Sequence, residues 1–176
     1  MKLKQCYVIL GIVQLIVWSS LSLADQTISF LLPSGVQVEI VEKPFQKSLF
    51  KITGCDGRTT CLINGRVPFG IDVELPKTFV SKINISYRSS VYSLDSSDMY
   101  NAWGNRPLEV KEGIRYFGGK CFDAKNCQFR GLFSDAAGSF VAEWKIVDGV
   151  SIRTVLTDSN DVTGLFLKYI DPPEYE

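Results

Sequence analysis

The residue types in this chain restrict its chemistry before any fold is considered. Its 176 residues include no histidine, which removes Ser-His and Cys-His nucleophilic systems and every histidine-based metal site. No phosphate-binding loop and no G-x-S-x-G motif occurs. Carboxylate pairs of the glycosidase type remain, but with 19 acidic residues such pairs are inevitable and none is marked out. The sequence therefore assigns no catalytic residue, and a carboxylate-based hydrolase remains only as an alternative.

Four of the five cysteines form two pairs with the spacing C-x5-C, namely Cys55 with Cys61 and Cys121 with Cys127. Disulfides form in oxidising compartments, and this spacing favours two local bridges that each close a short loop. The alternative is one zinc site made from all four thiolates, although zinc sites usually space their cysteines by about two to four residues. We expect two disulfides and no metal at these positions.

Two aspartate clusters, at residues 95–98 and 158–161, offer oxygen ligands that calcium would accept. Neither cluster fits the calcium-binding loop, which has a fixed glycine and a terminal glutamate. Turn formation and helix capping explain both clusters. We therefore expect no metal site and no cofactor.

Aromatic and arginine side chains are better candidates, and their chemistry is binding. Residues 95–107 are the longest stretch with no strand pattern, and long irregular loops in compact domains are often functional. The stretch contains Met99, Tyr100, Trp103 and Arg106, which include residue types that dominate protein interfaces. In the alternative interpretation the stretch folds back and its aromatic rings cover the end of the core.

The element that we expect to organise the core is a long antiparallel hairpin over Ser139–Asp158. Alternate apolar positions on its two arms are Phe140, Ala142, Trp144 and Ile146, and then Val150, Ile152 and Leu156. A three-residue loop, 147–149, would place both sets on one face, with Trp144 opposite Ile152. A two-residue Asp148-Gly149 turn would instead place Trp144 opposite Arg153. We predict the three-residue loop, with Trp144 in the core.

The same register has a consequence for the arginines. It places Arg153 opposite Glu143 as a cross-strand ion pair. Arg130 is then the better candidate for binding an acidic group of a ligand or partner.

The remaining pattern predicts short strands and one helix. Residues 27–41 alternate around Pro33-Ser34-Gly35, which is typical of a hairpin with a three-residue loop. Apolar residues between 159 and 169 recur at helical spacing, with a strand as the alternative. The predicted fold is mainly β: a single antiparallel β-sandwich or partly closed barrel, built of hairpins, with one short C-terminal helix.

The first 24 residues have the pattern of a bacterial signal peptide. Lys2 and Lys4 precede an apolar run that ends near Trp18, and Ser22-Leu23-Ala24 offers small residues for cleavage. An uncleaved membrane anchor is the alternative, but the run is too short to span a bilayer. We expect a leader at 1–24, one β-rich domain at 25–176, and a periplasmic or secreted protein.

Charge and composition narrow the class of partner. Basic and acidic residues are equal at 19 each, so the chain carries no footprint for nucleic acid and no polybasic patch for a membrane. We expect no nucleic-acid partner and no stable membrane insertion after the leader is removed. The function that we expect is an exported, non-enzymatic binding protein, of the inhibitor or immunity type, which neutralises a hydrolase or toxin in the envelope. A structural, assembly or carbohydrate-binding protein of the bacterial envelope is the alternative.

Overall fold

The computed structural model describes residues 25–57, 61–71, 74–103, 114–134 and 138–172. The predicted leader at 1–24 and the candidate Arg106 lie outside the described residues.

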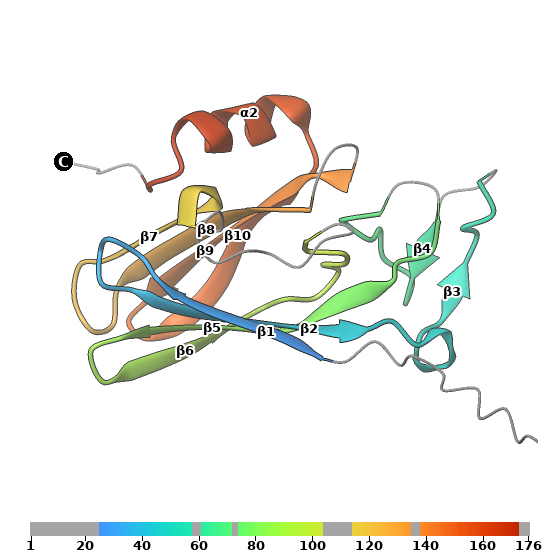
Figure 1. Ribbon diagram of the computed structural model, residues 1–176. Helices are drawn as coiled ribbons and strands as arrows, with labels where there is room; N and C mark the ends of the chain where they lie inside the picture. The colour runs from blue at the N-terminus through green and yellow to red at the C-terminus, as the bar shows by residue number, and fades with distance from the viewer. Residues whose placement is uncertain (1–24, 58–60, 72–73, 104–113, 135–137, 173–176) are drawn as a thin grey trace, which may run out of the picture.

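The described residues form two four-stranded antiparallel sheets that pack face to face (Figure 1). The first sheet has the order β1-β2-β5-β6, made of β1 (Gln26–Leu31), β2 (Gln37–Pro44), β5 (Thr78–Tyr87) and β6 (Ser90–Leu94). The second has the order β10-β9-β8-β7, made of β7 (Phe117–Cys121), β8 (Cys127–Phe133), β9 (Phe140–Val147) and β10 (Val150–Thr157). The sandwich interpretation of the sequence is confirmed.

Smaller elements lie beside the two sheets. They are the 3-10 turns η1 (Lys47–Leu49) and η2 (Ile114–Tyr116), the short pair β3 (Ile52–Thr53) and β4 (Leu62–Ile63), and the helix α2 (Asn160–Lys168). The hairpin β3–β4 lies at the end of the sandwich opposite the turns that join β1 to β2 and β5 to β6 (Figure 1).

The core lies between the sheets and is rich in aromatic rings. Strands of both sheets contribute to one buried cluster, which includes Phe30, Ile40 and Ile85 from the first and Phe129, Phe133 and Trp144 from the second. Trp144 is fully buried, and its ring stacks on Phe129 with centroids 5.7 Å apart. The prediction that Trp144 is a core residue is confirmed.

The β1–β2 hairpin forms as its sequence predicts. Phe30 pairs with Val38, and the amide of Leu32 donates to the carbonyl of Val36 at 2.9 Å across the three-residue loop. Gly35 closes that loop with φ at 82°, a conformation that costs glycine no steric strain.

The predicted register of the β9–β10 hairpin is wrong. Asp148 and Gly149 form a two-residue turn with φ of 50° and 83°, and Trp144 lies opposite Arg153. The prediction assumed that the apolar residues of both arms share the core face. Instead β10 is an edge strand, and Val150 and Ile152 are directed outward and exposed. An irregularity between Arg153 and Val155 then changes the register and returns Leu156 to the core side.

Helix α2 confirms the predicted C-terminal helix. It begins after Ser159, whose carbonyl accepts the amide of Thr163 at 2.9 Å. Its buried residue is Phe166, and the helix packs on β8 and β9, across the outer face of the second sheet (Figure 1).

Both predicted disulfides are present, Cys55–Cys61 and Cys121–Cys127. Disulfides persist in oxidising compartments, so they are compatible with a periplasmic or extracellular protein. Among the described residues, no helix has the length and apolar character needed to cross a membrane.

Candidate binding surfaces

The stretch that the sequence singled out is held as an additional strand-like segment. The amide of Val80 donates to the carbonyl of Met99 at 3.0 Å on one side, and the amide of Tyr100 donates to Phe69 at 2.8 Å on the other. The described part of this stretch, up to Trp103, is therefore ordered by pairing with segments distant in sequence. Such pairing leaves no local periodicity, so the sequence pattern did not reveal it.

The candidate side chains in this segment face inward. Met99, Tyr100 and Trp103 are only 1%, 5% and 8% exposed, and the ring of Trp103 packs against Phe117 and Phe133. Met99 and Trp103 belong to the core cluster, and Tyr100 packs edge to face against Phe45 and Phe50. This burial favours the alternative interpretation, in which the stretch folds back onto the core. The three side chains are not available as exposed anchors for a partner.

A buried carboxylate holds the same segment in place. Glu42, 3% exposed, accepts hydrogen bonds from the hydroxyl of Thr78 and, at 2.7 Å, from the amide of Ala102. Burial raises the pKa of the Glu42 carboxyl, against these two hydrogen bonds, which lower it. Glu42 therefore has a structural role, joining β2, β5 and the residues after Met99.

The arginine opposite Glu143 is not the one that the sequence predicted. Arg130, not Arg153, lies opposite Glu143. Arg130 is buried beneath α2, where its guanidinium group lies 5.1 Å from the ring centre of Phe166 and donates to the carbonyl of Asp171. Arg130 attaches the helix to the sheet, so its predicted role in binding an acidic partner has no exposed surface to act through.

Arg153 crosses to the other sheet because the two-residue turn directs it toward the end of β6. Its guanidinium group donates to the carbonyl of Ser97 at 2.6 Å and lies 3.2 Å from the carboxylate of Asp95. The aspartate cluster at 95–98 is thus held by arginine. Among the described residues, no group of three or more potential ligands gathers around a metal position.

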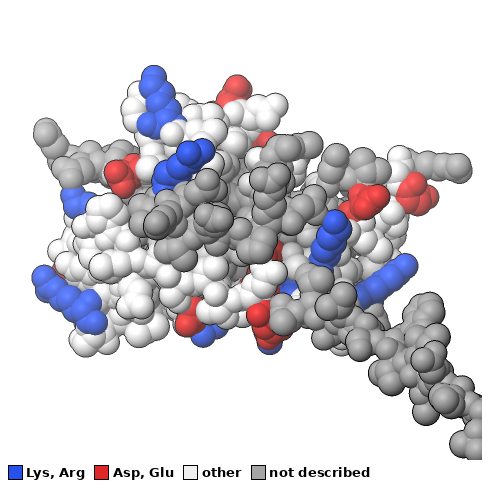
Figure 2. Space-filling model, in the orientation of Figure 1, with Lys and Arg blue, Asp and Glu red and all other residues white. Residues whose placement is uncertain are grey.

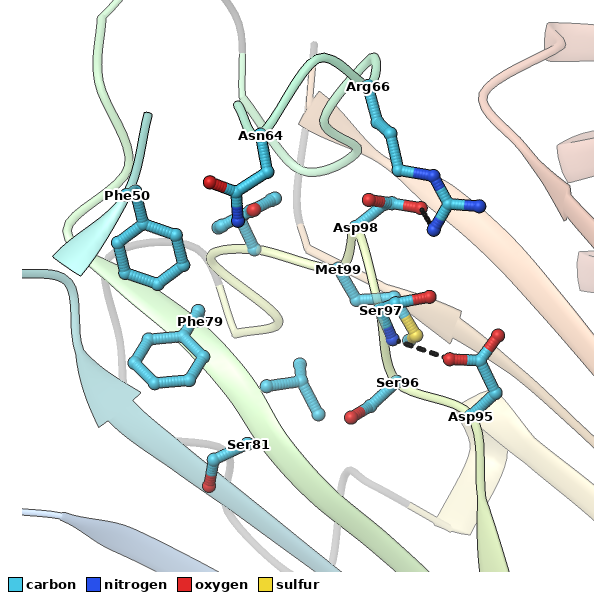
Figure 3. Close-up of a pocket in the computed structure, with 12 residues that line it drawn as sticks. Phe50, Asn64, Arg66, Phe79, Ser81, Asp95, Ser96, Ser97, Asp98 and Met99 are labelled. Carbon is cyan, nitrogen blue, oxygen red and sulfur yellow. Dashed lines mark hydrogen bonds and ion pairs between the residues drawn. The ribbon is translucent and has the colours of Figure 1, made fainter. Parts of the chain in front are cut away.

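A pocket of about 430 Å³ opens beside this segment. Its lining comes from four separate parts of the chain. Phe50 and Phe79 lie on one side, and Arg66, Asp95 and Asp98 lie on the other (Figure 3). The volume is within the range of small-molecule sites, about 300–1,000 Å³.

The charged side of the pocket is internally paired. Arg66 lies 3.0 Å from Asp98, and Arg153 lies 3.2 Å from Asp95. Burial acts to raise the pKa of Asp95, but hydrogen bonds from Ser97 and the charges of Arg153 and Arg66 bring it below its ordinary value. Burial, together with the charge of Asp98, raises the pKa of Tyr100 to about 12, so this hydroxyl group stays protonated to a higher pH than that of an exposed tyrosine.

A second candidate surface lies on the outer face of the second sheet, near the β9–β10 turn. Four large apolar side chains there are 50% to 62% exposed: Phe122, Val147, Val150 and Ile152. We call these four residues the hairpin patch. Val147 pairs with Val150, and the adjacent row runs Ile152, Lys145, Gln128 and Lys120 across all four strands. Among the described residues, α2 covers this face around Arg130, and the side chains of the hairpin patch lie exposed beyond it.

The hairpin patch is built on a cross-linked frame. The Cys121–Cys127 disulfide closes the loop that contains Phe122. The turn of the next hairpin is tied to this loop, because the amide of Gly149 donates to the carbonyl of Lys125 at 2.9 Å and that of Asp148 donates to Asn126 at 3.1 Å. The four apolar side chains are therefore presented on backbone that is fixed before any partner binds.

Charge on the visible face of the described chain is mixed. Basic and acidic side chains are interspersed there, without a broad region of one sign (Figure 2). A surface of this kind gives little long-range steering of a charged polymer.

Comparison of the chain with protein-family models, with curated proteins and with solved structures found no match. The function must therefore be inferred from the two surfaces themselves.

Sequence reasoning identified one side of the pocket, because residues 95–100 of the stretch that it singled out line it, and it missed the hairpin patch. The pocket joins residues from positions 50 to 100, and no local pattern brings them together. The hairpin patch did have a signal, the Asp-Gly dipeptide, which favours a two-residue turn. That turn would have placed Val150 and Ile152 on the face opposite Trp144.

Proposed function

We propose that this chain is an exported, non-enzymatic binding protein of the bacterial envelope, of the inhibitor or immunity type. It neutralises a hydrolase or a toxin by binding to it, and the hairpin patch is the contact surface. The observation that carries the proposal is the exposure of Phe122, Val147, Val150 and Ile152 together on one cross-linked frame.

The chemistry of the hairpin patch suits a protein partner. Exposed apolar clusters rimmed by polar residues mark interaction sites on soluble proteins. Lys120, Gln128 and Lys145 lie beside the apolar side chains and form a polar border of this kind. A frame that is fixed beforehand reduces the entropy lost on binding.

The test is capture of the partner followed by an activity assay. The chain from Asp25 is immobilised and exposed to periplasmic extract and culture supernatant. We expect it to retain a hydrolase or toxin whose activity is lost when the purified protein is added in equal amount. A retained protein that has no such activity, or whose activity persists in the complex, would contradict the inhibitor assignment.

Variants locate the contact. Val150→Asp combined with Ile152→Asp is expected to weaken binding by at least about 2 kcal/mol, because two charges would be buried against an apolar surface. The matched control is Val91→Asp, at a similarly exposed valine on β6 of the other sheet. Equal binding by the double variant and the wild type, or an equal loss in the Val91 variant, would show that the patch is not the interface.

A further inference from the structure

We propose that the pocket beside residues 95–100 binds a neutral saccharide. This site is separate from the hairpin patch: its residues come from β5, the segments around Phe50 and Arg66, and the strand-like segment after β6. Its lining combines an aromatic side and a hydrogen-bonding side across a space of about 430 Å³ (Figure 3).

The aromatic side supplies an apolar wall. Phe50 and Phe79 pack edge to face with ring centroids 5.4 Å apart, and Phe45 stacks behind Phe50 at 4.5 Å. Both rings that line the pocket are half-buried, so each keeps part of its surface toward the opening. The C–H face of a sugar ring is an apolar surface that can pack against an aromatic ring.

The opposite side supplies donors and acceptors whose charges already balance. Asp98 lies 3.0 Å from Arg66 and 3.8 Å from Arg153, and Asp95 lies 3.2 Å from Arg153. An ionic ligand would have to compete with these pairs. A hydroxyl group both donates and accepts, so it can donate to a carboxylate and accept from a guanidinium group while the pairs remain. Neutral polyols are therefore the class that fits this wall.

The polar wall is held in position from behind. The indole Nε1–H of Trp144 donates to the carbonyl of Asp95 at 2.9 Å, and Arg153 donates to that of Ser97 at 2.6 Å. Met99, which also lines the pocket, is held by the backbone hydrogen bond from Val80. The site thus exists before the ligand arrives, which lowers the conformational cost of binding.

The test is a titration of the purified protein followed by backbone amide signals in NMR spectra. The probes are three neutral oligosaccharides (chitotetraose, cellotetraose and maltotetraose) and one acidic oligosaccharide (tetragalacturonate). We expect at least one neutral probe to shift the amide signals of Phe79, Ser96, Ser97 and Asp98. Phe50→Leu and Asp95→Asn should each weaken that binding by about tenfold. Phe122→Leu, at an exposed phenylalanine of the hairpin patch, is the control and should leave the affinity unchanged.

Several results would overturn the proposal. They are unmoved pocket signals with every neutral probe at millimolar concentration, binding of the acidic probe alone, and equal loss of affinity in the Phe122 control.

The length of the saccharide distinguishes two sources of the ligand. Affinity that rises from the monosaccharide to the tetrasaccharide indicates a glycan chain, and equal affinity indicates a free sugar. Both of these results support the site, and neither depends on the hairpin patch.

Discussion

At the residue scale, Glu42 is a carboxyl group whose ionisation is opposed by burial. It is a charged side chain in the interior, and its two hydrogen bonds attach β2 to Thr78 and Ala102. Since burial raises the pKa of this carboxyl above the ordinary value of 4.5, the folded protein binds the proton more tightly than the unfolded chain does. The stabilisation that comes from this tighter proton binding is fully present at pH values below the pKa of Glu42 in the unfolded chain. It is lost as the pH rises through the pKa of Glu42 in the folded protein.

We predict that Glu42→Gln removes this pH dependence. Glutamine keeps an oxygen that can accept from Ala102 but carries no charge, so the variant should gain stability relative to wild type as pH rises from about 4 to 8. Urea midpoints measured across that range provide the check. Glu42→Ala should lose about 1–3 kcal/mol, because both donors would be left without their acceptor.

The control is Glu39→Gln, on the same strand but part-exposed beside Lys82. It leaves Glu42 and its two hydrogen bonds in place, so the contribution of Glu42 to the pH dependence should remain. Parallel curves for wild type and the Glu42→Gln protein would show that Glu42 does not titrate differently in the folded state.

At the scale of elements, the β9–β10 turn determines which residues form the hairpin patch. Gly149 has φ at 83°, and a Cβ atom added there would meet no atom within 4 Å. Gly149→Ala therefore tests backbone conformation without a clash. We expect it to lower the free energy of unfolding by about 1 kcal/mol, since a positive φ is sterically strained for alanine but not for glycine.

The matched comparison is Gly164→Ala in α2, where the space is also open. There the added methyl group should raise stability by about 0.5–1 kcal/mol, because alanine favours a helix. Chemical denaturation of both variants gives the two values. If both substitutions change stability in the same direction, the left-handed conformation at Gly149 is not what fixes the turn.

The same elements show which parts of the fold follow from sequence. The β1–β2 hairpin was predicted correctly because its apolar residues on both strands face the core, as in the pair Phe30 and Val38. In the β9–β10 hairpin, the edge strand directs Val150 outward and Arg153 inward. Alternation alone specifies two faces but not which one is buried, so the assumption that apolar residues face inward gave the wrong register.

The candidate site was less accessible to sequence reasoning for a related physical reason. Tyr100 and Trp103 lie in a polar stretch, yet their burial depends on backbone pairing with Phe69 and Val80. The pocket that results is lined by both Phe50 and Asp95, and the sequence around each residue gives no indication that the other lies near it. Long-range pairing of this kind is decided by the whole fold.

At the scale of the whole molecule, the two disulfides serve opposite ends of the sandwich. Cys121–Cys127 joins β7 to β8 and frames the hairpin patch. Cys55–Cys61 lies between β3 and β4, close in sequence to Asn64 and Arg66, which line the pocket. Each bridge closes a short loop, which constrains the unfolded chain by about 2 kcal/mol.

We predict that removal of the two bridges has distinct effects on stability and binding. Cys121→Ala with Cys127→Ala should cost more stability than Cys55→Ala with Cys61→Ala, because the first pair is buried in the core and the second is half-buried. The first change should weaken capture of a protein partner, and the second should weaken saccharide binding, since each loosens the frame of one surface. Urea unfolding, the capture assay and the NMR titration measure the three quantities. Equal losses of both binding activities in either variant would mean that the surfaces are not independently framed.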